Sequence, residues 1–102
     1  MTLTSRQNRY LRGLTHHLQP VVMVADKGLS ENVMAEIESA LEHHELIKIK
    51  LRGNRETRGR WIKEISKACS TEPVQVIGQV ACFFRRNPKK PVIALPDNSQ
   101  KV

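Results

Sequence analysis

Residues 46–52 read LIKIKLR, and from Ile47 to Arg52 apolar and cationic side chains alternate. Successive side chains of an extended chain point to opposite faces, so this alternation indicates a β-strand that is buried on one face only. The buried face holds Ile47, Ile49 and Leu51, and the exposed face holds Lys48, Lys50 and Arg52. The sequence therefore predicts a strand with a row of cations on its exposed side.

Two helices and one strand are predicted before this stretch. The nearer helix follows Ser30, a favourable N-cap, and runs to about His43. Residues 21–24 are a short apolar run, which is typical of a strand buried on both faces. A first helix begins with Thr4 and Gln7 at capping-box spacing. Its apolar face holds Leu3, Tyr10, Leu11, Leu14 and Leu18, and its opposite face holds Arg6, Arg9 and Arg12.

A third helix and a hairpin are predicted after the alternating strand. The helix spans about residues 57–69 and is closed by Pro73. Residues 74–77 and 80–84 are expected to pair as a hairpin, and a weaker strand is expected at 92–95. The helix places Trp61, Ile62, Ile65, Ala68 and Cys69 on its core side, and Arg60, Lys63 and Lys67 outside.

This order of elements predicts an α/β domain with a mixed sheet and helices packed mainly against one side of it. Phe83 and Phe84 are adjacent, so we expect them on opposite faces of the last strand, with one of them exposed. A chain of 102 residues has room for one core. We place a single domain at residues 1–97 and a flexible polar tail at 98–102.

The charge balance favours a polyanionic partner. Seventeen Lys and Arg against ten Asp and Glu give a net charge of +7. No apolar run approaches the roughly 20 residues of a membrane-spanning helix, and the N-terminus has no signal-peptide core, so we expect a cytoplasmic protein. Cys69 and Cys82 have no zinc-type spacing and are expected to be buried free thiols.

The cations are separated from the acids along the chain. Six cationic and two acidic residues lie between Arg52 and Lys67, whereas Glu31, Glu38 and Glu42 share the outer face of the second helix. A charged helix face is usually just solvated and crossed by pairs four residues apart. Here the alternating strand and the first helix are also cationic, and this segregation favours binding of phosphates with release of counterions.

The connection before the second helix is a further candidate site. Lys27 and Gly28 lie beside a helix N-terminus, where free N–H groups and the helix dipole attract phosphate. The alternative is an ordinary tight turn in which Gly28 adopts a left-handed conformation.

Four segments together resemble a known family. Residues 20–22 (PVV), 27–29 (KGL), 41–48 (LEHHELIK) and 74–78 (VQVIG), in this order and spacing, resemble the single-domain bacterial YhbY-like members of the CRM (chloroplast RNA splicing and ribosome maturation) family. The resemblance covers about residues 2–95. It implies a four-stranded mixed sheet with three helices, similar to the C-terminal domain of bacterial translation initiation factor three, and association through RNA with precursors of the large ribosomal subunit.

The resemblance also implies a G-x-x-G loop like the KH-domain loop that clamps backbone nucleotides. In this chain the loop is Ala25-Asp26-Lys27-Gly28, so the first glycine is replaced and Asp26 adds a negative charge. The candidate RNA-binding residues are therefore Arg6, Arg9, Arg12, Lys27, Gly28, Lys48, Lys50, Arg52, Arg55, Arg58, Arg60, Lys63 and Lys67.

Other functions are weaker alternatives. The pairs His16-His17 and His43-His44 are better explained by placement at helix C-termini than by metal binding. A magnesium-dependent nuclease would use Glu38 and Glu42, a DNA-binding protein would use the same cations, and an adaptor would use the acidic helix face. We expect no catalytic residues, cofactor, metal or small-molecule substrate, and a monomer.

Overall fold

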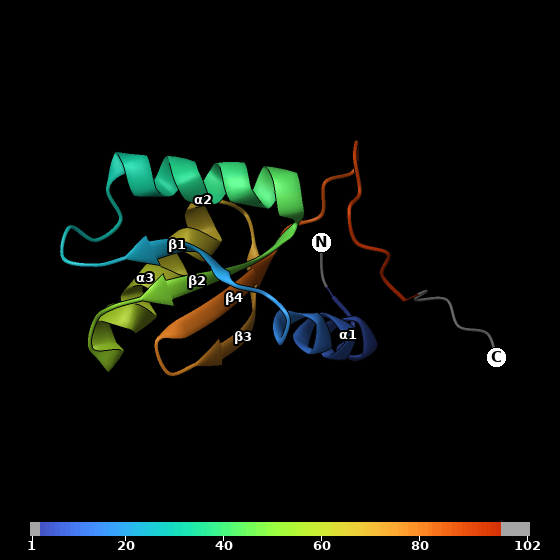
Figure 1. Ribbon diagram of the computed structural model, residues 1–102, viewed down its shortest axis with the longest axis horizontal. Helices are drawn as coiled ribbons and strands as arrows, with labels where there is room; N and C mark the ends of the chain where they lie inside the picture. Colours follow the sequence, from blue (N-terminus) through green and yellow to red (C-terminus); the bar gives the residue numbers. More distant parts are fainter. Residues whose placement is uncertain (1–2, 97–102) are drawn as a thin grey trace.

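The computed structural model describes residues 3–96, which form three helices and four strands (Figure 1). They follow one another as α1 (Ser5–Thr15), β1 (Pro20–Val24), α2 (Glu31–His44), β2 (Leu46–Leu51), α3 (Arg55–Ala68), β3 (Glu72–Ile77) and β4 (Val80–Phe84). The sheet order is β1-β2-β4-β3, with β1 parallel to β2 and the other neighbours antiparallel. The mixed four-stranded sheet is thus confirmed, while the expected tail at 98–102 lies outside the described residues.

Side-chain caps begin each helix. The hydroxyl of Thr4 accepts the N–H of Gln7 at 3.1 Å, and the Gln7 amide oxygen accepts the N–H of Thr4 at the same distance. Ser30 caps α2 as expected. Asn54 caps α3 through a 2.8 Å bond from the N–H of Thr57, so this helix begins two residues earlier than predicted.

The main core lies between one face of the sheet and the helices α2 and α3. In Figure 1, α2 runs along β1 and α3 lies behind the sheet. The apolar face of β2, including Ile47 and Ile49, packs against Ile37 of α2 and Ile65 of α3, and all four are buried. Each such side chain stabilises the fold by about 1.5–3 kcal/mol relative to an exposed one.

The opposite face of the sheet is only partly covered. Leu11 of α1 packs with Leu46, Val74 and Phe84 at one end of this face, so α1 lies on the other side from α2 and α3. Phe83 and Phe84 do occupy opposite faces, but both are buried, and the expected exposure of one was wrong because α1 covers that end.

Three predicted features differ in the structure. β1 is an edge strand with one open face, so Val21 and Met23 are 49% and 55% exposed and the strand is not buried on both faces. Pro73 lies inside β3, an edge strand that tolerates proline, and does not close α3. Residues 92–95 do not form a strand.

Two helix-face assignments also differ from the prediction. Tyr10 of α1 is 41% exposed, and Ala68 at the end of α3 is exposed, so neither belongs to the core. Both lie at the margin of the apolar stripe on their helix, where the packing partner determines which side chains are covered.

Glu45 anchors the segment that follows β4. It ends α2 with φ 63°, and its side chain is fully buried. Its carboxylate accepts hydrogen bonds from Arg86 Nη1, from the N–H of Asn87 at 2.6 Å, and from the N–H groups of Val92 and Ile93 at 2.9 and 2.8 Å. Burial raises the pKa of Glu45, but these donors outweigh it and leave the pKa below its ordinary value.

Candidate nucleic-acid interface

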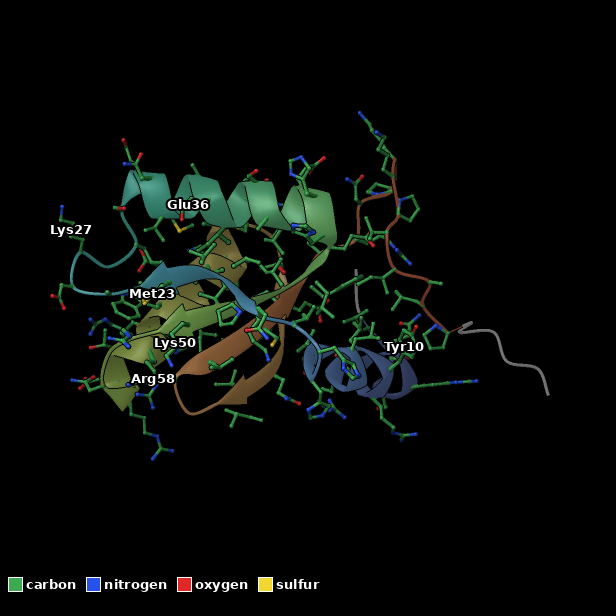
Figure 2. All side chains as sticks on the ribbon, in the orientation of Figure 1. Tyr10, Met23, Lys27, Glu36, Lys50 and Arg58 are labelled. Atoms are coloured by element: carbon green, nitrogen blue, oxygen red, sulfur yellow. The ribbon has the colours of Figure 1, made fainter. Side chains whose placement is uncertain are left out.

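The uncovered part of the sheet carries the predicted cationic row. Lys48 pairs with Cys82 of β4, and Lys50 lies between Met23 of β1 and Val80 of β4. Both lysines are partly exposed, and Figure 2 shows Lys50 beside Met23. We call this surface the open sheet face, defined by Met23, Lys48, Lys50, Gln75, Ile77 and Val80.

Arg52 continues the row beyond the end of β2. Its N–H donates to the carbonyl of Val24 at 2.8 Å, which extends the pairing with β1, and its side chain is exposed. Within residues 3–96 no carboxylate lies within 4.0 Å of the charged groups of Lys48, Lys50 or Arg52. The charge of this row is therefore not neutralised by the described part of the protein.

The β1–α2 loop and the β2–α3 loop both lie against Trp61, at the end of the sheet where Arg52 follows β2. A Cβ on Gly53 would lie 3.1 Å from the Trp61 ring, and one on Gly28 would lie 3.5 Å from Trp61 Nε1. Gly28 has φ +64°, which side chains rarely adopt. The Arg58 guanidinium donates to the carbonyl of Gly53 at 2.6 Å. The indole thus contacts both the β1–α2 loop, at Gly28, and the β2–α3 loop, at Gly53.

The β1–α2 loop closes as a tight turn. The N–H of Gly28 donates to the carbonyl of Ala25 at 2.8 Å, and Lys27 is exposed at the tip (Figure 2). Among the described non-glycine residues, only Glu45 and Ser70 have positive φ. Ala25 therefore has an ordinary backbone conformation, and this turn does not require glycine at its first position.

The predicted cations do not form one surface. α3 packs against the sheet face opposite to Lys48 and Lys50, so its exposed residues Arg60, Lys63 and Lys67 point the other way. Of α3, Trp61 contacts the β1–α2 loop at Gly28, and Arg58 bonds to Gly53 just before the helix, so the first turns of α3 lie at this end of the sheet. The exposed residues Arg6, Arg9 and Arg12 lie on α1, which Figure 1 shows at the other end of the sheet from the β1–α2 loop.

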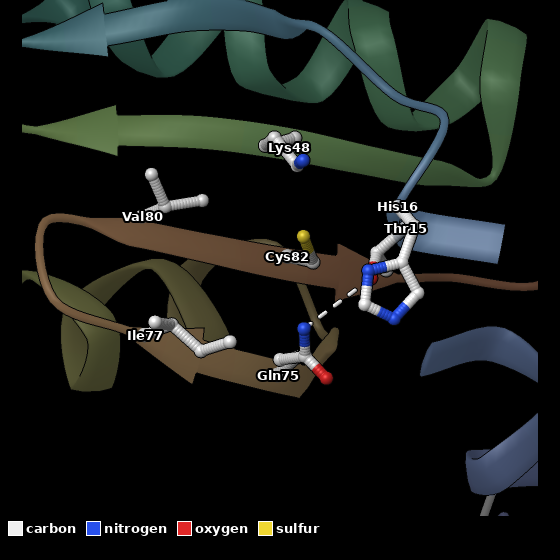
Figure 3. A pocket seen from close by; sticks show the side chains of 7 residues that line it. All are labelled: Thr15, His16, Lys48, Gln75, Ile77, Val80 and Cys82. Atoms are coloured by element: carbon white, nitrogen blue, oxygen red, sulfur yellow. Dashed lines mark hydrogen bonds between the residues drawn. The ribbon is translucent and has the colours of Figure 1, made fainter. Parts of the chain in front are cut away.

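A cavity of about 230 Å³ opens on the open sheet face beside the end of α1 (Figure 3). His16, which follows α1, contributes a polar group beside those of Lys48 on β2 and Gln75 on β3. The Gln75 amide donates to the Thr15 hydroxyl at 3.4 Å. The remaining lining residues are Ile77, Val80 and Cys82. His16 and Gln75 were not predicted, because their approach depends on how α1 docks on the sheet.

The acidic face of α2 is partly engaged within the protein. Arg85 bonds to Glu38 at 2.8 Å and to Glu42 at 3.3 Å, so these carboxylates are partly neutralised. Within residues 3–96 no three His, Cys, Asp or Glu side chains are placed to hold a metal ion. Both cysteines are buried as predicted, and burial raises the pKa of the Cys69 and Cys82 thiols.

Across residues 3–96 no helix is both long and apolar enough to cross a membrane.

Comparisons with known proteins agree with this fold. The CRS1 / YhbY (CRM) domain matches residues 3–85. An RNA-binding protein of Haemophilus influenzae is 48% identical over 85 residues, covering 82% of this chain and 86% of that protein. A probable RNA-binding protein of Pseudomonas aeruginosa is 43% identical over 90 residues, with 87% and 86% covered. The solution structure of a hypothetical protein from Staphylococcus aureus matches with a TM-score of 0.78 and 34% identity, over 93% of this chain and all of that one.

Proposed function

The chain belongs to the CRS1 / YhbY (CRM) domain family, and from this membership we propose that it is a non-enzymatic RNA-binding protein of the cytoplasm that acts in ribosome assembly. Its ligand in this proposal is precursor large-subunit ribosomal RNA. The RNA-binding part is supported by relatives that carry that name. The observation that carries the proposal is the unneutralised row of Lys48, Lys50 and Arg52 on the part of the sheet face that α1 leaves uncovered.

The position of the row favours an extended polyanion. Arg85 and Arg86 are paired with glutamates, so the charges of these arginines are largely satisfied inside the protein. The charges of Lys48 and Lys50 remain available to phosphates, and each phosphate contact releases counterions. Binding to this row would therefore weaken steeply with salt.

In this proposal, the end of the sheet that carries the β1–α2 and β2–α3 loops makes a second group of contacts with RNA. Lys27 lies in the turn next to Gly28, and the N-terminus of α2 follows it, while Arg58 bonds to Gly53 on the other loop that Trp61 supports. A KH-like role for the turn requires a phosphate close to its N–H groups, which the absence of a Cβ at Gly28 favours. Arg52 connects this group to the open sheet face.

A pair of double variants tests the assignment. Lys48→Ala/Lys50→Ala should lower the salt slope of binding to a single-stranded RNA by about 1.4, at about 0.7 per lost phosphate contact. Lys89→Ala/Lys90→Ala removes the same charge from exposed positions after β4 and should leave the slope near that of the wild type. Equal slopes for the two variants would contradict the proposed interface.

The ribosomal part needs its own experiment. Tagged protein from growing cells should sediment with precursors of the large subunit, and this association should weaken in the Lys48→Ala/Lys50→Ala variant. Sedimentation only as free protein would argue against ribosome assembly. Tighter binding to duplex DNA than to structured ribosomal RNA at physiological salt would favour the DNA-binding alternative.

A further inference from the structure

We infer that the cavity between His16, Lys48 and Gln75 holds one unpaired nucleobase of the bound RNA. This inference rests on the proposed function and makes it more specific, because the cationic row alone recognises phosphate and carries no information about base identity. Sequence-specific RNA recognition usually targets unpaired bases, which protein side chains stack against and contact through hydrogen bonds.

The size and lining of the cavity suit one nucleobase. Its volume of about 230 Å³ is below the about 300–1,000 Å³ typical of sites for drug-sized ligands. Ile77 and Val80 line it with apolar side chains, and His16 presents an exposed imidazole at its rim (Figure 3). A base placed here has an aliphatic surface and an aromatic ring against which to stack.

Gln75 supplies the group that reads the edge of the base. Its Nε2 donates to the Thr15 hydroxyl at a long 3.4 Å, while that hydroxyl donates to the Arg12 carbonyl at 2.6 Å. The Gln75 oxygen has no hydrogen-bond partner within residues 3–96. One acceptor and a second N–H therefore remain for a ligand, which is the pattern that base edges match.

Lys48 joins the cavity to the phosphate path. It lines the cavity and belongs to the same row as Lys50, so a nucleotide with its base in the cavity has its phosphate beside a cation. None of the described residues that line this cavity is acidic. An apolar pocket with an amide and a cationic rim fits an RNA nucleotide better than it fits a free anion.

The test uses single-stranded U12, A12 and C12 oligoribonucleotides and a U12 with three central abasic residues. The wild type should bind at least one intact oligomer more tightly than the abasic one, and should distinguish among the three bases. Gln75→Leu should reduce the largest preference by about fivefold, the effect of one hydrogen bond, with an unchanged salt slope. Gln79→Leu, an exposed glutamine in the hairpin turn, should keep the preference.

An independent readout needs no variant. In the wild-type protein, the side-chain amide resonances of Gln75 should shift when the preferred oligomer is added, and those of Gln79 should not. Equal affinity for intact and abasic oligomers, or an unchanged preference in a folded Gln75→Leu, would overturn the inference and leave RNA binding intact. Failure to bind any oligomer would overturn the proposed function and the base site with it.

Discussion

Replacing the buried Glu45 by glutamine should be one of the most destabilising single changes in this protein. The substitution keeps the shape of the side chain and the left-handed backbone of position 45, so it isolates the effect of the charge. Four donors now bond to the carboxylate: Arg86 Nη1 and the N–H groups of Asn87, Val92 and Ile93. The NH₂ group of a glutamine amide would face some of these four donors without being able to accept from them, and the Arg86 charge would be left unpaired.

Breaking a buried ion pair in this way costs about 3–5 kcal/mol. A domain of this size has about 5–15 kcal/mol of total stability, so Glu45→Gln should remove a large part of it. Urea denaturation measures the loss, and amide hydrogen exchange at Val92 and Ile93 shows whether the segment after β4 detaches first. Glu36→Gln on the exposed side of α2 is the control and should change stability by less than about 0.5 kcal/mol. Equal denaturation midpoints for the two variants would refute the role of Glu45.

The stability lost in Glu45→Gln should become smaller in acid. The pKa of Glu45 is lower in the folded protein than the value of about 4.3 expected when unfolded. The unfolded state therefore binds more protons in acid, and the carboxylate stabilises the fold fully only above that pH. The difference between wild type and Glu45→Gln should be constant near neutral pH and shrink as pH falls below about 4.3. A difference that does not shrink in acid would contradict the pKa assignment.

Three further predictions follow from local geometry. Gly28→Ala should cost about 1–2 kcal/mol in urea denaturation because φ is +64°, whereas Gly59→Ala, in open space on α3, should stabilise by about 0.5–1 kcal/mol. Ser66→Ala should leave the melting temperature unchanged or raise it, since the buried Ser66 hydroxyl has no partner within residues 3–96; a large drop would contradict this. The thiols of Cys69 and Cys82 should react with a thiol reagent only when the protein unfolds, because burial raises the pKa of each; fast reaction in the native state would argue otherwise.

Features that depend on neighbouring residues along the chain were predictable from the sequence. The capping box of Thr4 and Gln7 and the N-cap Ser30 act within one helical turn, so their side chains identify the helix starts directly. The alternation through residues 46–52 likewise predicted which side of β2 is buried. These patterns were enough to predict the order of the three helices and four strands, but they also predicted a strand at 92–95 that does not form.

Features that depend on the order of strands in space were not predictable. An apolar run such as residues 21–24 suits a central strand, and only the sheet order shows that β1 lies at an edge. The candidate site likewise depends on spatial arrangement, because α3 packs on the sheet face opposite to Lys48 and its exposed cations point away from that residue. The role of Glu45 was not predicted, because its partners lie more than forty residues later in the chain.

The position of Trp61 has a practical consequence. It is the single tryptophan of the chain, and it lies under both loops at one end of the sheet, whereas the single tyrosine, Tyr10, lies on α1 at the other end. The native protein thus carries its own fluorescent label at a defined place. Quenching or a spectral shift of the indole upon titration reports arrival of a ligand at the loop end without any chemical tag. A ligand confined to the surface of α1 would bind without changing that signal.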